Sequence, residues 1–238
     1  MNATDRPLLS ILMPVFNEAR TVEEAIRQVT STDLGVPIEV VVVDDGSTDG
    51  TETILARDGW PAGVSILRHD VNQGKGSAVR TALGVARGEV AAIFDADLEY
   101  DPADLKALIE PIVAGEANAV FGVRVFNGYT SHSFLYVLGN RGVTLAANVL
   151  FNVYIADLMT CHKVIRTHLF RKLPLQARGF DIEPEIAARL LQRRERIYEI
   201  PVHYRARATE DGKKLRAIDG VRVLKTLLRC RFSPRTVD

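Results

Sequence analysis

A buried strand that ends in two aspartates constrains this 238-residue chain more than any other feature. Residues Val90 to Phe94 are apolar, which is typical of a strand buried on both faces, and Asp95-Ala96-Asp97 follow at once. The carboxyl ends of parallel strands face the crevice in which open α/β sheets bind their ligands. Two carboxylates separated by one small residue suit a hard divalent cation that also takes oxygen ligands from a substrate. A strand-end cap followed by a turn is the simpler interpretation.

The stretches before this strand alternate between strands and helices. Apolar, β-branched runs predict strands over residues 8–15, 38–43 and 64–67, with helical segments between them. The first helix is expected to begin at a capping box formed by Thr21 and Glu24. This alternation predicts an α/β fold: one Rossmann-like domain with a mostly parallel, doubly wound central sheet flanked by helices.

Polar residues follow three of the predicted strands. Asn17 and Glu18 follow the first strand, Asp44 and Asp45 follow the second, and the aspartate pair follows the fourth. Parallel strands place these ends on one side of the sheet, where a carboxylate beside a helix start can bind ribose hydroxyls. Lys75, between two glycines, could reach a diphosphate as a point charge. Each loop taken alone could be an ordinary strand-to-helix turn. The presence of all three at one side of the sheet is what indicates a binding site.

Four short motifs follow one another in this order: Pro14-Val15-Phe16-Asn17-Glu18, Asp44-Asp45-Gly46-Ser47, Asn72-Gln73-Gly74-Lys75-Gly76 and Asp95-Ala96-Asp97. They resemble the successive motifs of family 2 glycosyltransferases with the GT-A fold. Within that family the chain resembles the polyprenyl-phosphate glycosyltransferases, the dolichol-phosphate mannosyltransferase-like group, over nearly its whole length. The resemblance implies a nucleotide-diphosphate sugar donor, Mg²⁺ or Mn²⁺ as cofactor, and inversion at the anomeric carbon.

The resemblance also assigns roles to single residues. The metal is expected on Asp95 and Asp97. Glu99 stands where the mannosyltransferases typically carry glutamine; it either completes the metal shell or faces solvent, and it weakens an assignment of mannose as the sugar. The residues expected to bind the nucleotide sugar are Pro14, Val15, Asn17, Glu18, Asp44, Asp45, Ser47, Asn72, Lys75, Asp95, Ala96, Asp97 and Lys214.

A largely apolar helix is predicted from His132 to Ile155. Polar residues recur on it every four positions: Asn140, Thr144, Asn148 and Asn152. Such a helix either packs in a core with a buried polar seam or lies in a membrane interface. Its only charge, Arg141, requires an anionic partner. The family resemblance implies a lipid-linked phosphate as that partner, and an intramolecular carboxylate is the alternative.

Two further cationic elements follow strand ends. Arg124, after a strand predicted over residues 119–123, resembles an arginine that handles phosphate; a solvated loop arginine is the alternative. Arg207 and Lys214 resemble the family's basic loop over the donor diphosphate, which excludes water as a lid does. A solvated basic turn would have the same composition. The residues expected to take part in catalysis are Asp97, Arg124, Arg141 and Arg207.

The expected acceptor is a polyprenyl phosphate, dolichyl or undecaprenyl. A phosphate monoester is already largely anionic at neutral pH, so it needs arginines to hold it more than a base to activate it. Relatives that transfer to sugar hydroxyls carry a Gln-x-x-Arg-Trp motif, whereas the single tryptophan here is Trp60, in the early half. A soluble small-molecule acceptor, a nucleotidyltransferase and a non-catalytic nucleotide-sugar-binding module remain alternatives. The base, the sugar and the oligomeric state stay open.

Composition limits the remaining partners. Thirty basic and thirty acidic residues give a net charge of zero, which argues against a nucleic-acid partner. Cys161 and Cys230 are too far apart in sequence to suggest a zinc site or disulfide scaffold. The first residues do not resemble a signal peptide and no apolar stretch is long enough to span a membrane, so we expect a cytoplasmic protein.

The chain is expected to divide near residue 215. Residues 1–215 form the predicted GT-A domain, with a nucleotide-sugar half over about residues 1–100 and an acceptor half over about 101–215. Residues 216–238 form a basic amphipathic helix and tail, in which apolar residues on one face alternate with Lys and Arg. Such a helix binds a membrane surface peripherally or packs on the domain.

Overall fold

The computed structural model describes residues 7–124, 134–205 and 217–234. At its centre is a seven-stranded sheet in the order β3-β2-β1-β4-β6-β5-β7. Neighbouring strands run parallel except where β6 pairs with β4 and β5. The predicted mostly parallel α/β sheet is therefore confirmed, with one reversed strand. The strands are β1 (Leu9–Val15), β2 (Ile38–Asp44), β3 (Val64–Arg68), β4 (Val90–Ile93), β5 (Ala119–Arg124), β6 (Lys163–Arg166) and β7 (Ile197–Val202).

The inner strands are buried on both faces, which explains their nearly continuous apolar sequence. Successive side chains of a strand point to opposite faces, so each strand contributes to two cores. In β1, Ile11 and Met13 belong to one core and Leu12 belongs to the other. In β2, Val42 joins the first core and Val41 joins the second.

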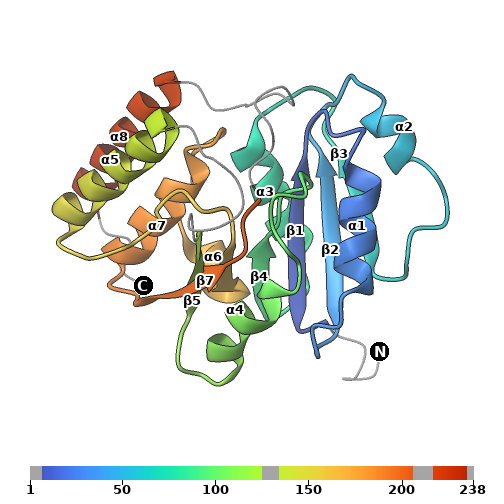
Figure 1. The fold of residues 1–238 in the computed structure, drawn as a ribbon, viewed down its shortest axis with the longest axis horizontal. Coiled ribbons are helices and arrows are strands. Elements are labelled where there is room, and N and C mark those ends of the chain that lie inside the picture. Colours follow the sequence, from blue (N-terminus) through green and yellow to red (C-terminus); the bar gives the residue numbers. More distant parts are fainter. Residues whose placement is uncertain (1–6, 125–133, 206–216, 235–238) are drawn as a thin grey trace.

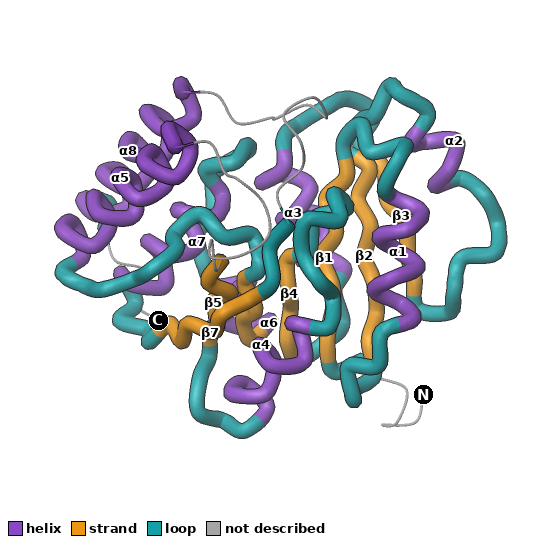
Figure 2. The backbone as a smooth tube through the Cα atoms, viewed as in Figure 1, coloured by secondary structure: helices purple, strands orange, loops and turns teal. Residues whose placement is uncertain are grey.

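Helices cover both faces of the sheet (Figure 1, Figure 2). One face packs against α1 (Val22–Ser31), α2 (Thr51–Leu55) and α4 (Asp104–Val113). The opposite face packs against α3 (Lys75–Val85), α6 (Thr167–Lys172) and α7 (Ile182–Gln192). Two longer helices, α5 (Phe134–Phe151) and α8 (Ala217–Phe232), lie side by side against α7 at one end of the molecule. No helix in the described parts of the chain is long and apolar enough to cross a membrane.

The C-terminal helix α8 shares the core of the preceding chain. Its Val223, Leu227 and Cys230 are buried in the cluster that also holds the apolar side of α7. The opposite side of α8 is exposed and carries large apolar residues. The sequence left open whether this helix binds a membrane surface or packs on the domain. In the structure one side of α8 packs on the domain.

The polar residues of α5 face inward. The Asn140 amide donates to Asp157, and the hydroxyl of Thr144 accepts a hydrogen bond from the amide of Leu158 at 3.4 Å. One turn further, Asn148 exchanges two hydrogen bonds with the backbone of Ile155. These three members of the predicted ridge thus form a seam between α5 and the loop that follows it, whereas Asn152 is exposed just beyond the end of α5. The exposed side of α5 is apolar except for Arg141.

One local prediction, the start of α1, is wrong. No capping box forms at α1, because the Thr21 hydroxyl donates to the Glu18 carboxylate at 3.0 Å and Glu24 pairs with residues one turn further along the helix. A short turn precedes α4, which begins at Asp104. The Asp101 carboxylate accepts the amide of Ala103 at 2.9 Å, which caps a turn ahead of α4.

Candidate active site

The carboxyl ends of β1, β2 and β4 lie side by side at one edge of the sheet. β1 lies between the other two strands, and its Val15 is opposite Asp44, the last residue of β2. The amide of Phe94, directly after β4, donates to the carbonyl of Leu12 at 3.0 Å. The loops that follow these strands leave the sheet at the same edge (Figure 2). The three polar loops predicted to converge therefore do so, with Asp95 next to the end of β1.

The first two loops are bound to each other by side chains. The Ser47 hydroxyl accepts the backbone amide of Asn17 at 2.9 Å, and the side-chain Oδ1 of Asn17 accepts the backbone amide of Thr48 at 2.8 Å. Asn17 has φ +55°, a left-handed conformation that asparagine tolerates better than most residues. The Glu18 amide donates to Thr51 at 2.9 Å. Asn17 and Ser47 thus shape the loops that border the crevice.

The two aspartates after β2 have different surroundings. Asp45 accepts three hydrogen bonds, from the ring of His69 at 2.6 Å and from the amides of Gln73 and Gly74 at 3.0 and 2.7 Å. It therefore fixes the loop that leads into α3. Asp44 accepts the amide of Ser47 through one oxygen, while its other oxygen is buried without a hydrogen-bond partner among the described residues. Asp44 is thus the carboxylate with unused acceptor capacity.

The glycines on either side of Lys75 are required by the protein itself. The first turn of α3 packs on the backbone between α6 and α7, where the amide of Gly76 donates to the carbonyl of Arg178 at 2.7 Å. A Cβ at Gly74 or Gly76 would lie 2.9 Å from a carbonyl carbon of that backbone. The sequence left the purpose of these glycines open, and the structure assigns them to this close backbone contact.

Lys75 joins the aspartate loop to α7. Its ammonium lies 2.7 Å from Asp95 Oδ2 and 2.6 Å from Glu183 Oε1, and all three side chains are largely buried. Burial acts to lower the pKa of Lys75, but the charges of Asp95 and Glu183 outweigh it and raise the pKa well above its usual value. Burial raises the pKa of the Glu183 carboxyl. The ammonium expected to reach a diphosphate is instead bound between two carboxylates.

Asp97 is half-buried, as Asp95 is. Its Oδ1 accepts the amide of Glu99 at 3.2 Å. The Glu99 carboxylate accepts the hydroxyl of Tyr204 at 2.7 Å. No three His, Cys, Asp or Glu side chains converge as a metal site in the described ranges, so Glu99 is not brought to the pair as a third ligand. Two carboxylates still fit Mg²⁺ or Mn²⁺, because such ions complete their shells with substrate oxygens and water.

Comparison with known proteins identifies the family. Residues 10–173, more than half of the chain, match the family described as Glycosyl transferase family 2. The chain belongs to this family. All four sequence motifs lie within the matched segment. The match therefore agrees with the family resemblance inferred from them.

Two relatives of this glycosyltransferase cover most of its length. A dolichol-phosphate mannosyltransferase from Pyrococcus furiosus is 26% identical over 208 residues, which are 86% of this chain and 58% of the relative. The chain thus spans less than two thirds of that protein. A UDP-N-acetylglucosamine–dolichyl-phosphate N-acetylglucosaminyltransferase from Methanococcus voltae is 23% identical over 215 residues, 82% of this chain and 84% of the relative.

Solved structures confirm the fold. Glucosyl-3-phosphoglycerate synthase from Mycobacterium tuberculosis, in complex with phosphoglyceric acid, superposes with a TM-score of 0.74 at 21% identity. The match covers 98% of this chain and 82% of that one. The same enzyme crystallised with Mn²⁺, uridine diphosphate and glucosyl-3-phosphoglycerate gives a TM-score of 0.69. At this level of identity the likeness establishes the GT-A architecture.

In this family 2 enzyme Arg124 is buried against a carboxylate. Its Nε and Nη2 donate to the two oxygens of Asp157 at 2.6 and 2.8 Å, and its guanidinium lies 5.2 Å from the ring centre of Tyr204. Burial acts to raise the pKa of Asp157, but the hydrogen bonds and charge of Arg124 outweigh it and lower that pKa. Arg124, expected to handle phosphate, therefore has an internal partner that the sequence analysis did not identify.

The other predicted cations lie elsewhere. Arg141 is exposed on the outer side of α5, and it pairs with no carboxylate among the described residues, so the alternative of an intramolecular partner is not observed there. Arg207 and Lys214 fall outside the described residues. Of the remaining predicted donor residues, Val15 and Ala96 are buried at the sheet edge, Pro14 is half-buried and Asn72 is exposed.

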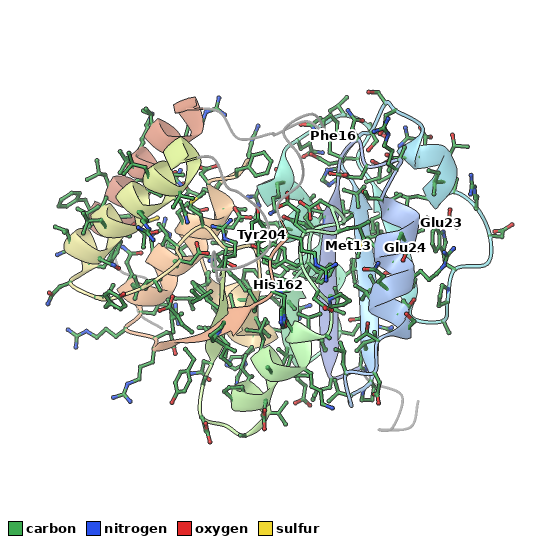
Figure 3. The ribbon with its side chains drawn as sticks, in the orientation of Figure 1. Met13, Phe16, Glu23, Glu24, His162 and Tyr204 are labelled. Atoms are coloured by element: carbon green, nitrogen blue, oxygen red, sulfur yellow. The ribbon has the colours of Figure 1, made fainter. Side chains whose placement is uncertain are left out.

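His162 is a further residue near the site that the sequence analysis did not select. Its ring stacks on Tyr100 with centroids 4.2 Å apart and packs against Phe94 at 5.3 Å. His162 is fully buried and Tyr204 is half-buried, and Figure 3 shows both near the middle of the view, with Glu23 and Glu24 on α1. Burial lowers the pKa of His162 to about 3, so the ring is neutral at physiological pH. The one sequence signal for the burial of His162 is its position next to Cys161, which is also buried.

Proposed function

We propose that this glycosyltransferase transfers a sugar, with inversion, from a nucleotide-diphosphate sugar to a polyprenyl phosphate at the cytoplasmic face of a membrane. In this proposal about the first hundred residues bind the donor, residues up to about 215 bind the acceptor, and the C-terminal segment, residues 216–238, meets the lipid surface. The catalytic and binding residues are those assigned by the family resemblance, with Arg207 and Lys214 over the diphosphate.

The edge formed by β1, β2 and β4 suits the donor. The Asp44 oxygen that has no hydrogen-bond partner lies 3.9 Å from Arg68 Nε, and it can accept a hydrogen bond from a base N–H or a ribose hydroxyl. Asp95 and Asp97 would hold Mg²⁺ or Mn²⁺, and a cation there neutralises charge on the leaving diphosphate. Lys75 fixes the orientation of Asp95. The neighbouring synthase, crystallised with uridine diphosphate and either Mn²⁺ or Mg²⁺, supports this donor and cofactor class.

The observation that carries the lipid acceptor is the outer face of α5 and α8. Large apolar side chains are exposed along both helices, and these lie next to each other (Figure 1). Soluble proteins rarely expose contiguous apolar patches of this kind without a partner. The exposed apolar residues on the outer face are Leu138, Leu145 and Val149 of α5, and Val221, Leu224, Leu228 and Phe232 of α8.

Charge on this outer face favours an anionic lipid surface. Arg141 lies on the same side of α5 as Leu145, and Arg222 and Lys225 accompany the apolar residues of α8. Neither helix carries an Asp or Glu among the residues whose side chains are described, 137–151 and 220–232. An apolar surface with only basic charges matches a bilayer that presents anionic phosphates.

The acceptor group is consistent with this surface. A lipid-linked phosphate monoester has a second pKa of about 6, so it arrives as an anion and is held by a cation such as Arg141. Several relatives carry names that specify such acceptors, among them an undecaprenyl-phosphate 4-deoxy-4-formamido-L-arabinose transferase from Aeromonas hydrophila, 33% identical over 123 residues. These names support the class of acceptor and leave the sugar open.

Transfer of label from a panel of UDP- and GDP-sugars to a short polyprenyl phosphate, with Mg²⁺ or Mn²⁺, tests the proposal. We expect lipid product from one donor, its loss in Asp97→Asn, and a raised acceptor KM in Arg141→Met. Arg27→Met, an exposed arginine on α1, is the matched control. Donor hydrolysis without lipid product, together with transfer to a soluble phosphorylated acid, would replace the lipid acceptor with a soluble one. An unchanged acceptor KM in Arg141→Met would remove Arg141 from the acceptor site.

Liposome flotation tests the surface separately from the chemistry. We expect the protein to float with vesicles that contain anionic lipid, and Leu145→Asp and Phe232→Asp to reduce the bound fraction at least several-fold. Val85→Asp, at an exposed valine of α3 away from the outer face, is the control. Equal flotation of all variants would contradict the assignment of this surface.

A further inference from the structure

Glu185 of α7 connects two segments that are far apart in the chain. Its Oε2 accepts the backbone amides of Gln176 and Ala177 at 2.8 and 2.7 Å. Its Oε1 accepts a hydrogen bond from Arg229 Nη2 of α8 at 2.7 Å, and Arg189 lies 4.0 Å away. The carboxylate is fully buried. Removing one partner of a buried, hydrogen-bonded carboxylate is costly, so Glu185, Arg229 and the two amides form one unit.

The backbone that Glu185 holds is the surface on which α3 begins. On its other side, the carbonyl of Arg178 accepts the amide of Gly76 at 2.7 Å, and Arg80 of α3 donates to the carbonyl of Ala177. The space between the two backbones admits no Cβ at Gly74 or Gly76. A shift of the backbone at 176–178 is therefore transmitted to the first turn of α3, because nothing between them can be compressed.

That first turn carries Lys75, whose ammonium is bound to Asp95 and Glu183. Glu183 is itself in the first turn of α7, two residues before Glu185. At the start of the same helix, Asp181 accepts the hydroxyl of Thr226 of α8 at 3.0 Å. Contacts from α8 thus lie on both sides of Glu183 in the sequence of α7.

We propose that α8 is a positioning element of the donor site, in which Arg229, through Glu185, fixes the 176–178 backbone and thereby holds Lys75 beside Asp95. Arg229 touches neither the aspartate pair nor Lys75, so it is a positioning residue. This inference rests on the proposed assignment of the Asp95 edge to the donor. Helix α8, which is exposed on the outer face, would thus be linked by a chain of contacts to the sheet edge that carries Asp95.

The first experiment needs no ligand. Acetylation of Lys75 by a soluble anhydride, followed by mass spectrometry, reports whether its ammonium stays buried, and amide hydrogen exchange of residues 176–178 and Gly76 reports on the backbone contact. In Arg229→Met we expect Lys75 to react at least tenfold faster and these amides to exchange faster. Lys225→Met, an exposed lysine one turn earlier on α8, should leave both rates unchanged.

A second arm separates positioning from loss of stability. Val29→Ala, in the other core on α1, lowers stability without touching α8 and should not increase Lys75 labelling under native conditions. Arg229→Lys retains a cation and should restore part of the protection. Faster exchange confined to α8, with Lys75 labelling unchanged in Arg229→Met, would overturn the proposal.

The third arm uses Mn²⁺ with UDP or GDP as probes, measured by calorimetry. We expect Arg229→Met to weaken nucleotide binding about tenfold, because part of the binding free energy must then be used to order Lys75 and Asp95. Weakened Lys75 protection with unchanged nucleotide affinity would overturn the link to the donor site. If the unmodified chain binds neither nucleotide, the proposed donor assignment fails, whereas the labelling experiment still decides whether α8 positions Lys75.

Discussion

Lys75 and Glu183 come from distant parts of the chain, yet Lys75 Nζ lies 2.6 Å from Glu183 Oε1. The same ammonium lies 2.7 Å from Asp95 Oδ2, so one cation neutralises two largely buried carboxylates. Through these two contacts Lys75 joins Asp95, at the end of β4, to Glu183 in the first turn of α7. A metal ion bound at the aspartates would meet an Asp95 whose orientation is already fixed by this contact.

Replacing Lys75 with Met leaves two buried carboxylates without their shared counter-ion. We expect the free energy of unfolding at pH 7.5 to fall by about 3–5 kcal/mol, the usual cost of an uncompensated buried charge. Urea denaturation followed by circular dichroism measures it. Lys106→Met, at an exposed lysine of α4, should change stability by less than about 0.5 kcal/mol.

The double variant Lys75→Met/Glu183→Gln distinguishes charge from packing. Removing one of the two carboxylates lowers the repulsion, so the double variant should be more stable than Lys75→Met by at least about 1 kcal/mol. If both variants unfold at the same urea concentration, the cost arises from lost packing of the lysine stem, and the electrostatic explanation is wrong.

Two glycines in α3 should respond to alanine in opposite directions. A Cβ at Gly76 would lie 2.9 Å from the carbonyl carbon of Ala177, whereas a Cβ at Gly84 meets no atom within 4 Å. We expect Gly76→Ala to destabilise by about 1–3 kcal/mol through overpacking. Gly84→Ala should stabilise by up to about 1 kcal/mol, because alanine favours a helix over glycine. Thermal unfolding of both variants checks this, and equal melting temperatures would contradict the close contact at Gly76.

The sequence predicted the parts of the fold that leave local patterns. Apolar runs marked β1, β2 and β4, and turn-forming residues marked where each strand ends, so the meeting of Asn17, Asp44 and Asp95 at one edge followed from the parallel arrangement alone. These predictions needed no knowledge of side-chain partners. The family resemblance then gave the chemistry that such an edge serves.

Partners that come from distant segments leave no such pattern. Nothing near Arg124 in the sequence indicated Asp157 as its partner, and nothing near Lys75 indicated Glu183. The capping-box prediction failed for a related reason. In a capping box the Thr21 hydroxyl would accept an amide of the first helical turn, whereas here it donates to Glu18, which the preceding loop places beside it. Spacing alone cannot choose between such competing local contacts.

The planar guanidinium of Arg124 should be difficult to replace. Two of its nitrogens bind the two oxygens of Asp157, a geometry that a lysine ammonium cannot reproduce. We expect Arg124→Lys to destabilise by about 2 kcal/mol, measured by urea denaturation. Arg27→Lys, at an exposed pair with Glu23, should stay within about 0.5 kcal/mol of the unmodified protein. Equal effects of the two substitutions would show that Arg124 needs only its charge.

His162 should make the fold sensitive to acid. Burial lowers the pKa of its ring from 6.5 to about 3, so the unfolded chain binds a proton more readily than the folded one. Stability therefore rises with pH across this interval: the contribution of the neutral ring is complete above pH 6.5 and is lost progressively as pH falls toward 3. Between pH 7.5 and pH 5 this single group should lower the free energy of unfolding by about 2 kcal/mol.

Comparing His162→Phe with the unmodified protein isolates this contribution, because other titrating groups affect both proteins alike. The variant keeps a ring against Tyr100 and cannot bind the proton. Between pH 7.5 and pH 5 the free energy of unfolding should fall in both proteins. We expect the fall to be about 2 kcal/mol smaller in His162→Phe than in the unmodified protein, whatever the absolute stability of the variant. His168→Phe, at an exposed histidine of α6, should keep the original pH dependence. Identical slopes for all three proteins would mean that the His162 ring finds a partner or solvent when it is protonated.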